Sequence, residues 1–139
     1  ASTSHAEETR KLMHQFREKI GIAFQIKDDL CDFGVDDVGK PLGIDIKEKK
    51  MTLPLIHALN QAPASERKRI IRLIKKHSDK KDKVAEVIRF VHESEGLAYA
   101  NAAMMRYRDE AFALLRQMPE SESRDSLEAL VNYVVERKY

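Results

Sequence analysis

The segment from Gly21 to Asp32 has a spacing of polar residues that a helix brings onto one face. Gly21, Gln25, Asp28 and Asp32 follow one another at intervals of four, three and four positions, and apolar residues occupy most positions between them. At 3.6 residues per turn, these four residues form a narrow stripe along an otherwise apolar helix. The spacing therefore predicts a helix that ends near Asp32 and carries a polar stripe at its carboxyl end.

Three carboxylates lie within about one turn of this helix end, namely Asp28, Asp29 and Asp32. Like charges four positions apart repel on a helix, and the macrodipole is already negative at the carboxyl end. Both effects oppose folding unless a cation is present. Mg²⁺ is commonly held by a few carboxylates together with substrate phosphates. The residues alone leave two interpretations open, which are a divalent-metal site and an acidic helix end in solvent.

Residues 33–50 are predicted to form a loop, because three glycines and one proline interrupt any periodicity there. A loop of this length in a compact domain is usually functional. Lysine is a natural phosphate ligand. Lys40 and Lys50, on a loop beside three carboxylates, could hold a diphosphate whose other oxygens bind Mg²⁺. Without a wider pattern, ordinary surface lysines are the better interpretation of both.

A wider pattern is present over this whole segment. It contains G-x-x-F-Q-x-x-D-D-x-x-D from Gly21, then G-K ending at Lys40, then D-x-x-x-x-K-x-T-x-P from Asp45 to Pro54. These residues resemble the second aspartate-rich region of the trans-type polyprenyl diphosphate synthases, with the spacing kept throughout. The chain that follows resembles the same family more weakly, up to the carboxyl terminus.

The resemblance implies a reaction and a set of site residues. In the family, an allylic diphosphate is ionised, and isopentenyl diphosphate attacks the resulting carbocation-like centre. Metal ions and cationic side chains stabilise the charge that builds on the departing diphosphate. Carried over by motif, the Mg²⁺ ligands are Asp28, Asp29 and Asp32, the catalytic residues that contact the allylic diphosphate are Lys40 and Lys50, and the residues lining the pocket near the reacting carbons are Phe24 and Gln25.

Parts of the family's site have no counterpart in these 139 residues. The family has two aspartate-rich regions facing each other across a helical cavity, and only the second is found here. Lys49 also stands where the family usually has glycine. The resemblance thus implies the carboxyl-terminal portion of a prenyltransferase that is homodimeric as a full-length parent, and we expect the portion alone to be inactive. The alternative is a standalone, non-catalytic helical partner or regulatory subunit of a prenyltransferase.

Composition and periodicity predict an all-α chain. Hydrophobic residues make up 42% and charged residues 35%, glycine and proline are few, and no segment shows the alternation of a strand. The resemblance implies an antiparallel helical bundle, the carboxyl-terminal part of the isoprenoid synthase fold, as a single domain over residues 1–139. Helices are predicted over about 5–33, about 52–60 with Thr52 as cap, 65–77 with Ser65 as cap, 80–92, 97–117 and 123–137.

A basic segment at 67–83, with nine lysines and arginines, raises the possibility of a nucleic-acid or other anionic partner. These residues alternate with a regular apolar stripe and accompany no recognition motif, so a solvated helix face is favoured and no nucleic-acid partner is expected. No apolar run approaches the roughly 20 residues of a membrane span, so no transmembrane segment is expected. The single cysteine, Cys31, is expected to be a core residue in a reducing cytoplasm.

Overall fold

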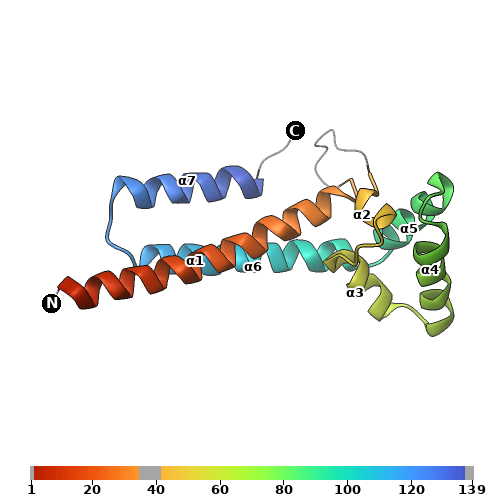
Figure 1. Cartoon of the computed structure of the whole chain (residues 1–139), viewed down its shortest axis with the longest axis horizontal. Helices are drawn as coiled ribbons and strands as arrows, with labels where there is room; N and C mark the ends of the chain where they lie inside the picture. Colours follow the sequence, from red (N-terminus) through yellow and green to blue (C-terminus); the bar gives the residue numbers. More distant parts are fainter. Residues whose placement is uncertain (1, 35–41, 137–139) are drawn as a thin grey trace. The chain divides into compact units, whose positions relative to one another are not determined.

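The computed structural model describes residues 2–34 and 42–136 (Figure 1). Within these ranges every regular element is a helix, so the predicted all-α class is confirmed. No helix of the described ranges is both long enough and apolar enough to cross a bilayer. The helices are α1 (Ser2–Cys31), α2 (Ile44–Lys47), α3 (Leu53–Gln61), α4 (Ala64–His77), α5 (Lys81–Glu93), α6 (Gly96–Arg116) and α7 (Glu122–Glu136).

The six predicted helices are all present with small shifts at their ends, and two predicted caps are wrong. Thr52 precedes α3 with an extended backbone, but its side chain makes no capping hydrogen bond. Pro54, at the second position of α3, lacks one of the two N–H groups that such a cap could bond. Pro63 occupies the position before α4, so Ser65 lies inside the first turn of α4. In the described part of the predicted loop 33–50 lies one short helix, α2, which the sequence did not indicate.

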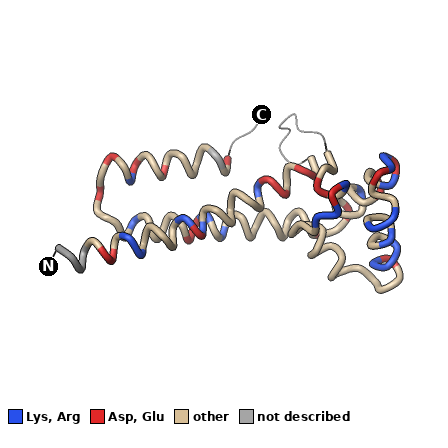
Figure 2. Tube along the Cα trace, viewed as in Figure 1, with Lys and Arg blue, Asp and Glu red and all other residues tan. Residues whose placement is uncertain are grey.

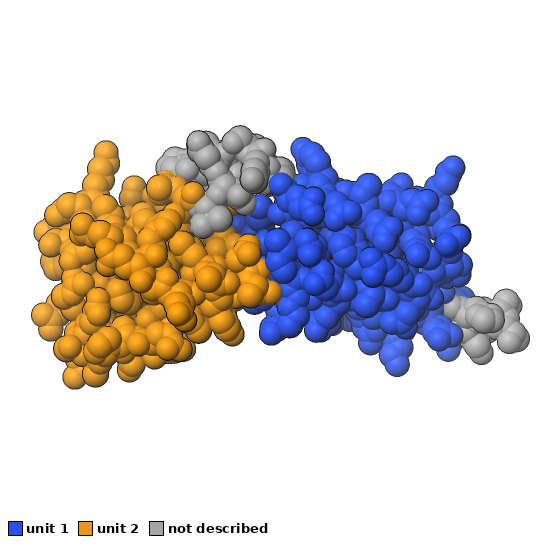
Figure 3. Space-filling view, turned by 180° about the vertical axis from the view of Figure 1, so that it is seen from behind, with its two compact units in different colours: residues 1–27, 103–137 blue, residues 28–102, 138–139 orange. Residues whose placement is uncertain are grey.

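The chain divides into two compact units (Figure 3). Of the described residues, the first unit contains 2–27 and 103–136, and the second contains 28–34 and 42–102. Both α1 and α6 contribute residues to each unit. The predicted single domain over residues 1–139 stays a prediction.

The first unit is an antiparallel arrangement of helices. Nζ of Lys19 in α1 lies 3.3 Å from Oε2 of Glu110 in α6. Met13, earlier in α1, and Met118, just after the end of α6, line one hollow. Residue numbers therefore rise along α1 as they fall along α6. This arrangement confirms the predicted bundle for this unit. Its interior contains the buried side chains of Phe16, Ile20, Ala23, Met104, Ala111, Leu115, Met118, Val131 and Val135.

In the second unit, α3, α4 and α5 pack against one another around a continuous core. The turn after α1 and the short helix α2 each add one residue to this core. Phe33 and Ile46 are both only 1% exposed, so burial holds the two ends of the segment that follows the acidic motif. The core residues are Phe33, Ile46, Leu55, Ala58, Leu59, Ile70, Leu73, Ile74, Val84, Val87, Phe90 and Val91.

Candidate functional site

The polar stripe predicted on α1 is present for three of its four members. Gly21, Gln25 and Asp28 are exposed. Asp32 departs from the stripe because α1 ends at Cys31, and the turn that follows carries Asp32 inward. The opposite side of this part of α1 is buried, through Ile20, Ala23, Ile26 and Leu30.

Asp32 closes the loop that follows α1. Its side chain is completely buried. Its carbonyl oxygen accepts a hydrogen bond of 3.0 Å from the backbone N–H of Gly43. Its Oδ1 accepts a second hydrogen bond, of 3.3 Å, from the backbone N–H of Asp45. Asp32, which directly follows α1, therefore fixes the point at which the chain enters α2. Its place in the motif did not indicate this structural role.

Gly43 allows this closure because no other residue fits its position. Its φ angle is 78°, in the left-handed region. A Cβ atom added there would lie 2.4 Å from Cγ1 of Val84, well inside contact distance. Glycine at this position thus lets the chain pass close to α5 and turn into α2.

Lys50 is positioned by the way α2 ends. The N–H of Lys49 bonds to the carbonyl oxygen of Ile46 at 2.9 Å, and the N–H of Lys50 bonds to that of Asp45 at 2.8 Å. These two bonds form a Schellman motif, whose residue after the cap adopts the left-handed conformation and is usually glycine. Here it is Lys49, with φ 61°. Asp45 therefore links Asp32, through its own N–H, to the backbone of Lys50.

His92, at the end of α5, also supports the turn after α1, and sequence reasoning missed it. Its Nε2 lies within hydrogen-bond distance of the carbonyl oxygen of Phe33. A carbonyl oxygen only accepts, so Nε2 carries the proton in this contact. No motif or periodicity relates His92 to a turn 59 positions earlier, so the sequence offered no signal for it.

The three motif carboxylates differ in exposure. Asp28 is exposed, Asp29 is 7% exposed and Asp32 is 0% exposed. Asp29 and Asp32 take part in interactions within the protein. Among the described residues, no group of three or more His, Cys, Asp or Glu side chains is arranged to hold a metal ion. Of the three carboxylates, Asp28 is the exposed one and is open to an ion shared with a substrate's phosphates, which is the usual mode for Mg²⁺. Metal binding by these residues stays a prediction.

The remaining predicted site residues are distributed as follows. Lys40 lies outside the described residues. Lys50 is exposed and belongs to the second unit, as do the three carboxylates. Phe24 is half-buried, Gln25 is exposed, and both belong to the first unit. The roles of all these residues stay predictions. Sequence reasoning also passed over Lys27, which is 4% exposed and takes part in an interaction, as expected of a lysine that is almost fully buried.

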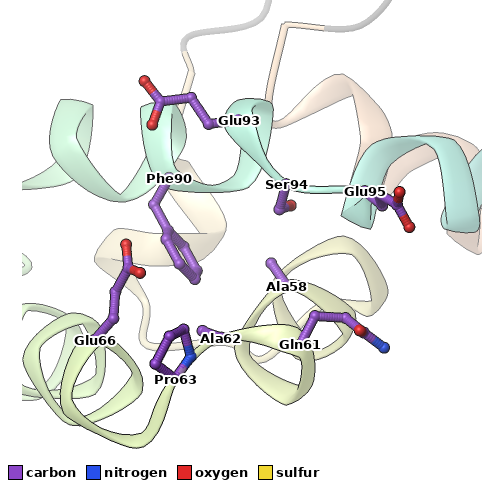
Figure 4. Close-up of a pocket in the computed structure, with 9 residues that line it drawn as sticks. All are labelled: Ala58, Gln61, Ala62, Pro63, Glu66, Phe90, Glu93, Ser94 and Glu95. Atoms are coloured by element: carbon purple, nitrogen blue, oxygen red, sulfur yellow. The ribbon is translucent and has the colours of Figure 1, made fainter.

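A hollow of about 480 Å³ in the second unit is chemically unsuited to a diphosphate (Figure 4). Three of its lining residues are glutamates, and no lysine or arginine lines it. Carboxylates repel a diphosphate unless cations intervene, and none of the predicted site residues that the structure describes lines this hollow. Its lining consists of Ala58, Gln61, Ala62, Pro63, Glu66, Phe90, Glu93, Ser94 and Glu95.

Comparison with known proteins agrees with this architecture. The sequence profile described as polyprenyl synthetase matches residues 1–91, and the chain therefore belongs to the polyprenyl synthetase family. It is 36% identical over 122 residues to the short chain isoprenyl diphosphate synthase of Methanothermobacter thermautotrophicus, an alignment that covers 86% of this chain and 37% of that protein.

Solved structures of prenyl diphosphate synthases have the same fold. The decaprenyl diphosphate synthase from Rhodobacter capsulatus matches with a TM-score of 0.85 and 31% identity, over 96% of this chain and 42% of that one. A geranylgeranyl pyrophosphate synthase from Corynebacterium glutamicum, complexed with calcium and isoprenyl diphosphate, matches with a TM-score of 0.77 and 28% identity, over 91% and 39%. The chain spans about two fifths of the length of these relatives.

Proposed function

We propose that the protein containing this chain is a polyprenyl diphosphate synthase that joins an allylic diphosphate to isopentenyl diphosphate with the help of Mg²⁺. One observation carries the proposal. The exposed carboxylate of Asp28 lies in the last turn of α1, and the backbone N–H groups of Gly43 and Asp45 donate hydrogen bonds to Asp32 just after that helix. Membership of the polyprenyl synthetase family supports the same conclusion.

In the proposed reaction, the bond between the allylic carbon and the diphosphate oxygen breaks, and negative charge builds on the departing diphosphate. Cations that meet this charge stabilise the transition state more than the ground state. Mg²⁺, when bound, neutralises part of it. Asp28 and Asp29 would hold the ion, and Lys40 and Lys50 would contact the diphosphate. Phe24 and Gln25 would line the pocket near the reacting carbons, and the apolar residues around them would keep water from the cation.

Asp32 has a different part in this proposal. Its Oδ1 and its carbonyl oxygen both accept backbone hydrogen bonds. Asp32 would therefore hold the loop that carries Lys40 and the segment that leads to Lys50. A residue of this kind acts through the positions of the others, and its contribution to metal binding would be smaller than that of Asp28.

We further propose that these 139 residues alone do not turn over substrate. The chain contains one aspartate-rich region and spans about two fifths of the length of its relatives. A second metal-binding region and the isopentenyl diphosphate site would then come from sequence beyond this chain.

The test is a condensation assay with labelled isopentenyl diphosphate and a series of allylic diphosphates. The protein recovered from its own cells is compared with the 139-residue chain. We expect Mg²⁺-dependent, EDTA-sensitive product from the cellular protein and none from the 139 residues. Product from the 139 residues would overturn the proposed inactivity. No product from the cellular protein with any allylic diphosphate would overturn the enzyme assignment and favour the non-catalytic partner.

A further inference from the structure

One face of α4 carries a row of cations that the fold does not use. Lys68, Arg72, Lys75 and Lys76 are all exposed, and we call these four residues the α4 basic face. At 100° per residue they lie within an arc of about 100°. Figure 2 shows the concentration of basic residues along this helix. Ile70, Leu73 and Ile74 lie on the opposite side of α4 and are buried in the core of the second unit.

Neighbouring cations of the same segment have structural partners, which sets the α4 basic face apart. Arg67 donates from Nε to the carbonyl oxygen of Leu59 at 2.9 Å and from Nη2 to that of Ala62 at 3.1 Å, so it fastens the α3–α4 junction. Arg69 pairs with Glu86 of α5. The four residues of the α4 basic face have no such ion pair or hydrogen bond among the described residues.

The stability of α4 does not explain the basic face. Lys68 and Arg72, and Arg72 and Lys76, stand four positions apart, where like charges repel on a helix. Lys75 and Lys76 lie in the last turn, where cations favour the macrodipole, but Lys68 and Arg72 do not. Between residues 64 and 83, nine lysines and arginines stand against three acidic residues. The segment therefore has an excess of positive charge that is complementary to an anionic surface.

We propose that the α4 basic face docks the protein on the surface of an anionic phospholipid bilayer. A single helix face is convex and presents its cations in one row, which suits an extended surface. The apolar side of α4 is buried in the core, so the contact is electrostatic and involves no insertion. The choice of a bilayer rests on the proposed function, because a polyprenyl diphosphate has a long hydrocarbon tail and leaves the enzyme most readily into a membrane.

A nucleic acid fits this face less well. Besides the basic residues, the exposed residues of α4 are Ala64 and Ser65, which are both small. The helix offers no exposed aromatic residue on which a base could stack, and no asparagine or glutamine to read a base edge. The arrangement provides charge without base recognition.

The experiment is co-sedimentation of the full chain with vesicles. We expect binding to phosphatidylcholine vesicles that contain about 30 mol% phosphatidylserine and none to pure phosphatidylcholine, and a fall of at least tenfold between about 50 and about 300 mM NaCl. The variant with Lys68, Arg72, Lys75 and Lys76 changed to glutamine should bind at least about 50-fold more weakly than the wild type. Each cation near an anionic surface contributes separately to the binding free energy.

The matched control removes the same charge elsewhere. The variant with Arg10, Lys11, Arg17 and Arg89 changed to glutamine loses four exposed cations outside the face and should bind the acidic vesicles within about threefold of the wild type. Equal losses in both variants, or no binding by the wild type, would overturn the proposal. Tighter binding to a duplex DNA or RNA than to the vesicles at the same salt would overturn it in favour of a nucleic acid.

Folding and activity are measured alongside binding. Circular dichroism should show unchanged helicity in the fourfold α4 variant, because its substitutions remove repulsion. If its helicity falls, the twofold variant Lys68→Gln, Arg72→Gln replaces it, with an expected loss of about tenfold. Prenyl transfer without vesicles is measured on the protein recovered from its own cells, with and without the same substitutions, and should be unchanged by them. If that cellular protein binds vesicles but transfers no prenyl group, the proposed function alone is wrong. If it transfers prenyl groups but does not bind vesicles, this proposal alone is wrong.

Discussion

Single residues of one motif have different tasks because they end in different environments. Asp28 and Asp32 both match the aspartate-rich pattern, yet Asp28 is exposed and Asp32 is completely buried. Exposure leaves the carboxylate of Asp28 accessible to a metal ion and a substrate. The buried carboxylate of Asp32 instead accepts a hydrogen bond from the backbone N–H of Asp45. A test of stability and a test of activity should therefore separate the two.

For stability, Asp32→Ala should lower the free energy of unfolding by about 2 kcal/mol, because it leaves the N–H of Asp45 without an acceptor and removes buried atoms. Asp32→Asn keeps an acceptor oxygen and should cost less than Asp32→Ala. Urea denaturation followed by circular dichroism measures both. Equal stability of Asp32→Ala and the wild type would contradict the anchoring role.

Lys49 occupies a backbone conformation that suits glycine, so Lys49→Gly should stabilise the protein. Its φ of 61° is costly for a residue with a Cβ atom. The greater freedom of glycine in the unfolded chain offsets part of the gain, and we expect a net increase of about 0.5 kcal/mol. The same denaturation experiment applies, with Lys47→Gly inside α2 as the destabilising control. A loss of stability in Lys49→Gly would refute the Schellman geometry.

For single residues, the sequence indicated which ones belong to the candidate site but not whether each is buried or exposed. The motif located Asp28, Asp32 and Lys50. The left-handed turn at Lys49 was not predicted, although glycine is usual at this position in the family. The burial of Asp32 depends on where α1 ends and on a turn that local patterns do not specify. The contact from His92 to Phe33 joins residues 59 positions apart and depends on tertiary packing.

Two helical glycines offer a test at the scale of elements. Gly21 lies within α1, and a Cβ added there meets nothing within 4 Å. Gly96 begins α6, and its Cβ would lie 2.3 Å from the carbonyl oxygen of Pro54 in α3. Gly21→Ala should stabilise the protein by about 0.5–1 kcal/mol through helix propensity. Gly96→Ala should destabilise it by about 2 kcal/mol, because α6 and α3 must separate.

Thermal and urea denaturation of the two alanine variants provide the comparison, and each serves as the control for the other. The same substitution in two helices should give opposite signs. Destabilisation of similar size in both variants would show that the close approach of Gly96 to Pro54 is not the reason why Gly96→Ala lowers the stability.

Helices could be predicted well from periodicity, and their caps less well. The stripes of α4 and α5 were clear because Ile70, Leu73, Val84 and Val87 recur at helical spacing and are buried. The helix α2 has only four residues, too few to show a period. Ser65 resembled a cap, but Pro63 fixes the chain direction two residues earlier, and α4 begins before Ser65.

For the whole molecule, family membership and the helical fold followed from the sequence, because the pattern over Gly21–Pro54 is specific. The division into two units did not, since α1 and α6 each contribute to both and show no break in sequence at residues 27 and 103. The chain matches its relatives over about two fifths of their length. The proposed activity is therefore tested on the protein recovered from its own cells.

The central claim is that the acidic end of α1 binds the metal ion and the diphosphate. The most direct test is the steady-state rate at which the Asp28→Ala variant of the protein recovered from its own cells condenses labelled isopentenyl diphosphate. The matched control is Asp79→Ala, which removes another exposed carboxylate of the second unit. We predict that Asp28→Ala lowers kcat/KM by about 100-fold or more, since it removes a metal ligand, and that Asp79→Ala leaves it unchanged. A rate for Asp28→Ala equal to that of the wild type would contradict the assignment of the acidic end of α1 as the metal and diphosphate site.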